Sequence, residues 1–155
     1  MEYTIQRADI QDAEGILRLQ KTAYKIEADR YNNDRIPPLI QTIDELRVQF
    51  TDHVILKAVA DNQIIGTVRA CERGNTCYIG RLAVHPDMQN KGIGTALMKA
   101  IEDQFNSPRF ELFTGSRSEK DIYLYRKLGY HIFRTEMDAF QKIELVYMEK
   151  KNTDR

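Results

Sequence analysis

The sequence predicts an α+β domain in which helices flank a central mixed β-sheet. Three observations indicate this fold class: consecutive β-branched runs joined by short turn sequences, an amphipathic helical segment directly after them, and strand–helix alternation towards the C-terminus. The 155 residues are close to the usual size of one domain, and no internal repeat or linker divides them. We therefore expect one domain over residues 1–150, followed by a short polar tail at 151–155.

The N-terminal part predicts one strand and two helices. Residues 3–7 resemble a strand, and Asp9 is placed to cap a helix with apolar residues at Ile10, Ala13, Ile16, Leu17 and Leu19. From Tyr24 to Gln41 the pattern is irregular and includes Pro37-Pro38. Thr42 and Glu45 then form a capping box, which predicts the start of a second helix.

The middle of the chain predicts an antiparallel meander. Its apolar runs cover residues 54–60, 64–71 and 76–84, and the turn sequences Asp61-Asn62 and Gly74-Asn75 separate them. After Pro86, apolar residues recur every four positions and predict a helix with one buried face: Ile93, Leu97, Ile101 and Phe105.

The C-terminal part predicts a strand at 110–114, a helix from Ser118 to Leu128 that Gly129 ends, and strands at 130–135 and 143–149. The expected order is therefore β-α-α-β-β-β-α-β-α-β-β. Exposed edge strands in such a sheet leave a homodimer possible.

Composition excludes several classes of partner. Lys plus Arg and Asp plus Glu number 23 each, so no net field favours nucleic acid. No apolar run is long enough for a membrane helix, and the N-terminus lacks the pattern of a secretory signal. These features predict a cytoplasmic protein without a membrane partner. Cys71 and Cys77 have no nearby histidines, so we expect free thiols and no metal site.

The segment from Leu82 to Thr95 carries the clearest chemical signal. It joins a buried strand to a helix N-terminus through a polar loop with two glycines, Gly92 and Gly94. Free N–H groups and the helix dipole favour an anion at such a start. The Rossmann fingerprint needs a third glycine where Leu97 stands, and the P-loop needs Gly-Lys-Ser/Thr, so neither is present. From this loop alone, a glycine turn without a ligand stays open.

Two motifs resemble those of GNAT N-acetyltransferases, which use acetyl-CoA. Gln89-x-x-Gly92-x-Gly94, after the apolar strand that ends Leu82-Ala83-Val84-x-Pro86, resembles the family's pyrophosphate-binding motif. Leu124-Tyr125-Arg126-Lys127-Leu128-Gly129-Tyr130 resembles its C-terminal helix signature. The resemblance covers most of the chain and tells least over residues 24–50. It implies a sheet splayed between its fourth and fifth strands.

The resemblance also implies where acetyl-CoA binds. The pantetheine arm would pair with the strand at Leu82, Ala83 and Val84. The pyrophosphate would lie against Gln89, Asn90, Lys91, Gly92, Ile93, Gly94 and Thr95, although Lys91 is equally a solvated loop lysine. Ser118 stands where the family often has asparagine, so its contact with CoA is open and it is equally a helix N-cap.

Tyr125 matches the family tyrosine that protonates the departing CoA thiolate, although a tyrosine that only packs the helix on the sheet fits the same pattern. The base that deprotonates the amine is not evident. Glu72, Glu111 and a water chain are candidates, and His85 is equally a strand terminus.

The expected activity is direct acetyl transfer to an amine through a ternary complex. Residues 24–50 would form part of the acceptor site, with Tyr24, Glu27, Asp29, Tyr31, Asp34 and Pro37-Pro38, but interleaved basic residues leave the acceptor open among small amines, peptides and proteins. A non-catalytic acyl-CoA-binding sensor or interaction module is the alternative. A nucleotide-binding or phosphoryl-transfer protein is a third reading, which the missing Gly-Lys-Ser/Thr disfavours.

Overall fold

The computed structural model describes residues 2–154 and confirms the predicted fold class. Its strands are β1 (Thr4–Arg7), β2 (Val54–Ala60), β3 (Gln63–Arg73), β4 (Thr76–Val84), β5 (Arg109–Gly115), β6 (His131–Asp138) and β7 (Ile143–Lys151). They form a seven-stranded sheet in the order β1-β2-β3-β4-β5-β7-β6. Neighbouring strands are antiparallel except β4 and β5, which are parallel, so the sheet is mixed.

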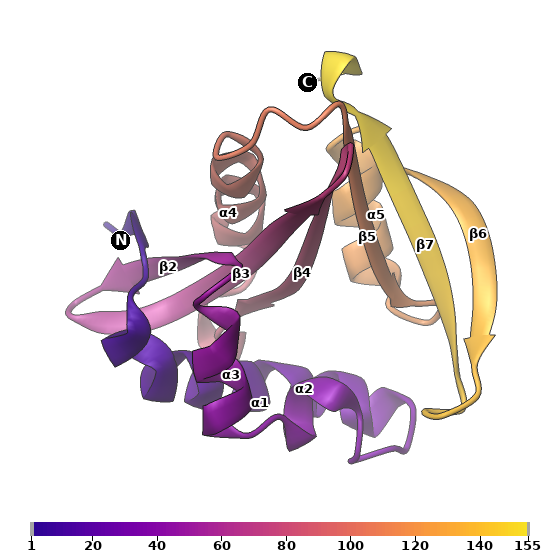
Figure 1. Ribbon diagram of the computed structural model, residues 1–155. Coiled ribbons are helices and arrows are strands. Elements are labelled where there is room, and N and C mark those ends of the chain that lie inside the picture. Colours follow the sequence, from indigo (N-terminus) through magenta and orange to yellow (C-terminus); the bar gives the residue numbers. More distant parts are fainter. Residues whose placement is uncertain (1, 155) are drawn as a thin grey trace.

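The helices are α1 (Ala13–Arg30), α2 (Pro37–Ile40), α3 (Ile43–Gln49), α4 (Ile93–Glu102) and α5 (Glu119–Lys127). They follow the predicted order, with α2 as an addition. The prediction of irregular structure from Tyr24 onward was wrong, because α1 continues to Arg30. In Figure 1, α4 and α5 lie behind the sheet, and α1 and α2 lie beneath the strands, towards the turn between β6 and β7.

The sheet opens between β4 and β5. The two strands pair only from Thr76–Arg109 to Tyr78–Glu111, at one end of each strand. Beyond these pairs they diverge, as the separation of their ribbons in Figure 1 shows. This divergence confirms the splay that was expected between the fourth and fifth strands.

A β-bulge lies in β4 where the splay begins to widen. Gly80 pairs with Arg69 of β3, and Ala83 pairs with Thr67, so the register shifts between these two pairs. Arg81 has a φ of 54°, a left-handed conformation that is uncommon for a residue with a side chain. Because a bulge bends its strand and re-aims the side chains, it turns the end of β4 away from β5.

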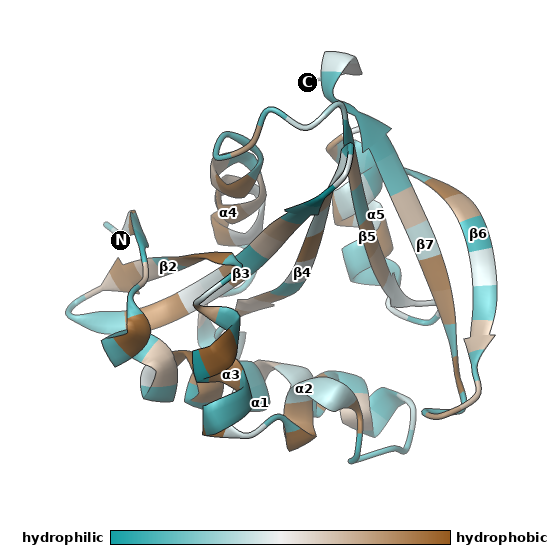
Figure 2. Ribbon diagram, viewed as in Figure 1, coloured by the Kyte–Doolittle hydropathy of each residue, from teal (hydrophilic) through white to brown (hydrophobic). Residues whose placement is uncertain are grey.

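The core lies between the sheet and its two rear helices. Ile93, Leu97, Met98 and Ile101 of α4 are fully buried against the central strands, and Figure 2 shows brown hydrophobic bands along these elements. A buried ion pair also joins α4 to β7, with Lys150 Nζ 2.8 Å from Glu102 Oε1. Among residues 2–154, no helix has both the length and the apolar character needed to cross a membrane.

Candidate active site between the splayed strands

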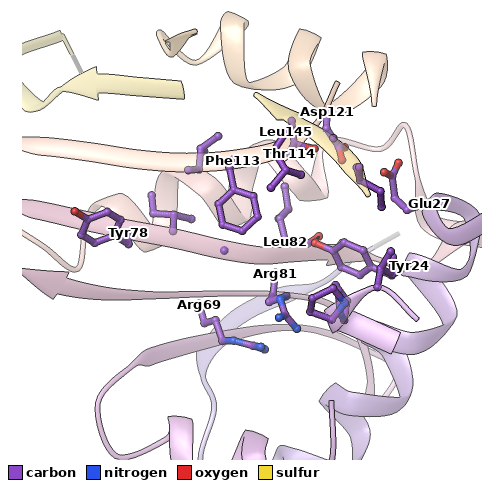
Figure 3. A pocket seen from close by; sticks show the side chains of 18 of the residues that line it. Tyr24, Glu27, Arg69, Tyr78, Arg81, Leu82, Phe113, Thr114, Asp121 and Leu145 are labelled. Carbon is purple, nitrogen blue, oxygen red and sulfur yellow. Dashed lines mark hydrogen bonds between the residues drawn. The ribbon is translucent and has the colours of Figure 1, made fainter. Parts of the chain in front are cut away.

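Two cavities meet where β4 and β5 diverge. The larger, of about 670 Å³, is bounded by α1, the start of α4 and α5. The smaller, of about 390 Å³, lies among α1, α2, α5, β3, β4, β5 and β7. Four residues line both cavities: Tyr24, Glu27, Leu82 and Asp121. Figure 3 shows them around the splay. Two ligands, one in each cavity, would therefore meet beside these four side chains.

The start of α4 opens into the larger cavity. Gly92 is its N-cap, with a φ of 82°, and no side chain caps the helix. The first N–H groups of an uncapped helix have no partner within the helix and attract an anion. Nine residues that the sequence assigned to the cofactor line this cavity: Leu82, Ala83, Val84, Gln89, Asn90, Gly92, Ile93, Gly94 and Thr95.

The other two assigned residues lie elsewhere. Lys91 is exposed and lines neither cavity. Ser118 is buried and also lines neither; its hydroxyl donates to Glu27 Oε2 instead of capping α5. The structure thus places Ser118 behind Glu27, where it orients that carboxylate.

Basic side chains that the sequence reasoning missed surround the larger cavity. They are Arg30, Lys99, Lys120 and Lys127. Thr95 and Lys99 lie four residues apart on one face of α4, and Lys120 and Lys127 lie seven apart on one face of α5. The spacing of these side chains on α4 and α5 could have been recognised in the sequence as two polar faces beside the predicted phosphate site. These cations, with the start of α4, suit a ligand that carries several phosphates.

Tyr125 is 7% exposed and lines the smaller cavity. Its hydroxyl makes no hydrogen bond with residues 2–154. Burial raises its pKa well above the ordinary value, and the charge of Asp121 raises it further. The phenol therefore stays protonated at neutral pH and is able to donate a proton.

Asp121, one turn before Tyr125 on α5, and Glu27 of α1 form an acidic pair. Burial raises the pKa of Asp121 to about 6, and the neighbouring Glu27 charge adds to the rise. Glu27 accepts from Ser118 and forms an ion pair with Arg30. A carboxyl group with a pKa near neutrality is suited to taking up a proton.

The carboxylates named from the sequence as possible bases do not reach either cavity. Glu72 accepts a hydrogen bond from Ser107, and Glu111 lies 2.7 Å from Arg109 Nη1 in an ion pair. His85 likewise lines neither cavity, and its Nδ1 accepts from the Asp87 N–H. Asp121, within the helix predicted from Ser118 to Leu128, was not among the bases considered from the sequence. Its position four residues before Tyr125 was the signal that was overlooked.

The smaller cavity receives several residues expected at the acceptor site. Tyr24, Glu27, Tyr31, Pro37 and Pro38 line it, whereas Asp29 and Asp34 do not. Three arginines also line it, Arg69 and Arg73 from β3 and Arg81 from the bulge. Cys71, also in the lining, and Cys77 are buried free thiols.

The family comparison covers most of the chain. A model of the acetyltransferase (GNAT) family matches residues 15–130. The Bacillus subtilis protein YqkA is 27% identical over 128 residues, which are 81% of this chain and 36% of YqkA. The chain thus spans about a third of that relative.

Solved structures share the fold. The PaiA N-acetyltransferase of Thermoplasma acidophilum, in complex with coenzyme A, superposes with a TM-score of 0.78 at 20% identity, over 97% of this chain and 99% of that one. The putative acetyltransferase yncA of Salmonella typhimurium, with acetyl-CoA, gives 0.77 at 16% identity, over 97% and 94%. At these identities the likeness concerns the fold alone.

Proposed function

Because the chain belongs to the GNAT acetyltransferase family, we propose that it transfers the acetyl group of acetyl-CoA directly to an amine. One observation carries the proposal: two cavities meet at the splay and share Tyr24, Glu27, Leu82 and Asp121. A donor in one cavity and an acceptor in the other would react at that junction, without a covalent acetyl-enzyme.

The larger cavity is the proposed acetyl-CoA site. The start of α4 and the surrounding lysines would hold the pyrophosphate, and the backbone of Leu82, Ala83 and Val84 would pair with the pantetheine arm. Tyr24 supports this part of β4, because its hydroxyl donates to the Leu82 carbonyl at 2.9 Å. The relatives with CoA and acetyl-CoA support the same ligand.

The acidic pair is the proposed site for the acceptor's amino group. A primary amine is protonated at neutral pH and must lose a proton before its nitrogen can attack the thioester carbonyl. Asp121 accepts this proton, and Glu27 adds negative charge that attracts the ammonium ion. The new C–N bond forms as the C–S bond breaks, and the proton on Asp121 passes to solvent.

Tyr125 is the proposed acid for the leaving thiolate. It gives its phenolic proton to the CoA sulfur and regains one from the nitrogen, which must lose a second proton to become the amide. The net products are the acetylated amine, CoA thiol and one proton in solution.

Thiol release from acetyl-CoA with a panel of amines tests the function. We expect release with one class of amine, and we expect Tyr125→Phe to lower kcat about a hundredfold or more while acetyl-CoA still binds. The matched control is Tyr130→Phe, which removes a hydroxyl from a ring centred 6.1 Å away that lines neither cavity.

Tyr130→Phe should lower the melting temperature, since its hydroxyl donates to Glu102 Oε2 at 2.7 Å, and should leave turnover largely intact. Full turnover by Tyr125→Phe would exclude this tyrosine as the acid. No release with any amine, while acetyl-CoA binds, would favour a non-catalytic acyl-CoA-binding module.

A further inference from the structure

None of the three arginines that line the smaller cavity has a carboxylate partner within residues 2–154, and two of them, Arg69 and Arg81, are withdrawn from solvent. Arg69, on β3, is only 3% exposed, and Arg81, in the bulge of β4, is half-buried. Both line the cavity. Within residues 2–154, neither arginine takes part in an ion pair. This leaves one buried and one half-buried cation beside each other at one end of the cavity.

Neutral amides hold the two guanidinium groups. Arg69 donates from Nη1 to Gln20 Oε1 and from Nη2 to Gln41 Oε1, each at 3.0 Å. Arg81 Nη1 donates to the same Gln41 oxygen at 3.3 Å. Gln41 is fixed in turn, because its amide nitrogen donates to Gln49 Oε1 at 2.8 Å. The amides orient the arginines but supply no negative charge.

The local electrostatics leave this charge uncompensated. Burial lowers the pKa of Arg69 to about 9, and the charge of Arg81 lowers it further. Glu45 exerts an attractive charge on Arg81, but its carboxylate accepts the Thr42 N–H at 2.8 Å in the capping box of α3. Buried charges are ordinarily paired, because an unpaired one has a large desolvation cost. An anion in the cavity would provide the missing partner.

The opposite end of the cavity has the opposite charge. Glu27 and Asp121 lie there, and Tyr24 lies between them and the arginines, as Figure 3 shows. The electrostatic coupling of Tyr24 to Asp121 and Glu27, and also to Arg81 and Arg69, agrees with this central position. The cavity thus offers a place for a cation at the splay and a place for an anion near β3.

We propose that the acceptor is a small amine that also carries a carboxylate, which Arg69 and Arg81 bind while its amino group lies against Glu27 and Asp121. This inference rests on the proposed function and names the class of its substrate. The forked donors of arginine match a carboxylate in two-point contact. A doubly charged phosphate would be repelled more strongly by the acidic pair, and a volume of about 390 Å³ suits a small molecule.

The test compares amines that differ only in the carboxylate. Thiol release from acetyl-CoA is measured with a set of L-amino acids and with the C-terminal amide of each. The kcat/KM of at least one acid should exceed that of its amide about tenfold or more, because a hydrogen bond to a charged group is lost with the amide. Arg81→Gln should reduce this ratio to near unity and leave the KM for acetyl-CoA unchanged.

Arg134→Gln is the matched control. It removes the same charge from β6, where Arg134 lines neither cavity, and should keep the wild-type ratio of acid to amide. A ratio near unity in the wild type, or an unchanged ratio in Arg81→Gln, would overturn the inference while the acetyltransferase function stands.

Direct binding separates this inference from the proposed function. If no amine causes thiol release, the same L-amino acids are tested for thermal stabilisation of the CoA-bound protein. Stabilisation by an acid but not by its amide, lost in Arg81→Gln, supports the carboxylate site although catalysis has failed. If none of the acids stabilises the protein, the carboxylate site is refuted as well.

Discussion

Asp121 and Tyr125 lie four residues apart on α5 and carry opposite chemical roles in the proposal. Burial disfavours the charged form of each group, so it keeps the phenol protonated and brings the carboxyl group close to neutrality. The same environment thus keeps the phenol in its protonated form, although as a weaker acid than a free tyrosine, and makes the carboxylate a better proton acceptor. The nearby Glu27 strengthens both effects.

The raised pKa of Asp121 predicts how stability and activity depend on pH. The folded state favours the neutral acid, so this contribution to stability is full below the ordinary value of 3.8 and is lost as pH rises through about 6. At neutral pH, Asp121→Asn should therefore raise the free energy of unfolding by about 1–2 kcal/mol. The same variant should lower turnover, and wild-type kcat/KM should fall on the acid side of pH 6.

Thermal unfolding and initial rates between about pH 3 and pH 8 measure both effects, a range that spans the ordinary and raised pKa values of Asp121. Asp34→Asn is the control, because Asp34 is exposed and lines neither cavity. Its stability and rate profiles should follow the wild type. An Asp121→Asn variant with wild-type turnover would exclude Asp121 as the base.

Helix α1 shows why a helix could be predicted only in part from the sequence. Its inward positions continue at Gln20, Tyr24 and Glu27 with helical spacing, but these side chains are polar because they face Arg69 and the two cavities. The apolar period that identifies a helix therefore fades after Leu19. Polar residues that line the cavities thus stand where the apolar residues that predict a helix would otherwise recur.

Elements with local signals were predicted well. The Asp61-Asn62 turn was readable, and both residues adopt positive φ, at 51° and 63°. The loop before α4 was readable from its glycines. The bulge at Arg81 and the pairing of Arg69 with Gln41 were not, because they depend on register and on contacts between distant residues. Arg69 within an apolar run was the one visible hint.

The start of α4 provides a test of residues 89–95, the proposed binding site for the pyrophosphate. Gly92→Glu places a carboxylate at the proposed phosphate site, so acetyl-CoA should no longer raise the melting temperature. The φ of 82° also strains most residues with a Cβ atom, glutamate among them. Gly92→Asn is therefore the matched control, since asparagine tolerates this conformation and is uncharged. If acetyl-CoA stabilises a folded Gly92→Glu variant normally, the loop is structural only.

At the scale of the molecule, acetyl-CoA in the larger cavity would contact β4 together with α1, α4 and α5. At about a hundred times its dissociation constant, such a ligand adds about 2.7 kcal/mol of stability. For a chain of this size we expect a rise in melting temperature of roughly 5–10 °C. ATP at the same concentration should give a smaller rise, because it lacks the pantetheine arm. Stabilisation by ATP and not by acetyl-CoA would contradict the proposed function.

The sharing of four residues by both cavities limits how acceptor specificity can diverge during evolution. If the proposed function holds, a substitution at Tyr24 or Leu82 would alter the donor and acceptor sites together, so we expect most changes there to be selected against. Ile36, Pro38 and Gln141 line only the smaller cavity and come from α2 and its approach and from the β6–β7 turn. We therefore expect a lineage that adopts a new amine to change first at these positions, with Ile36 kept apolar because it is buried in the core.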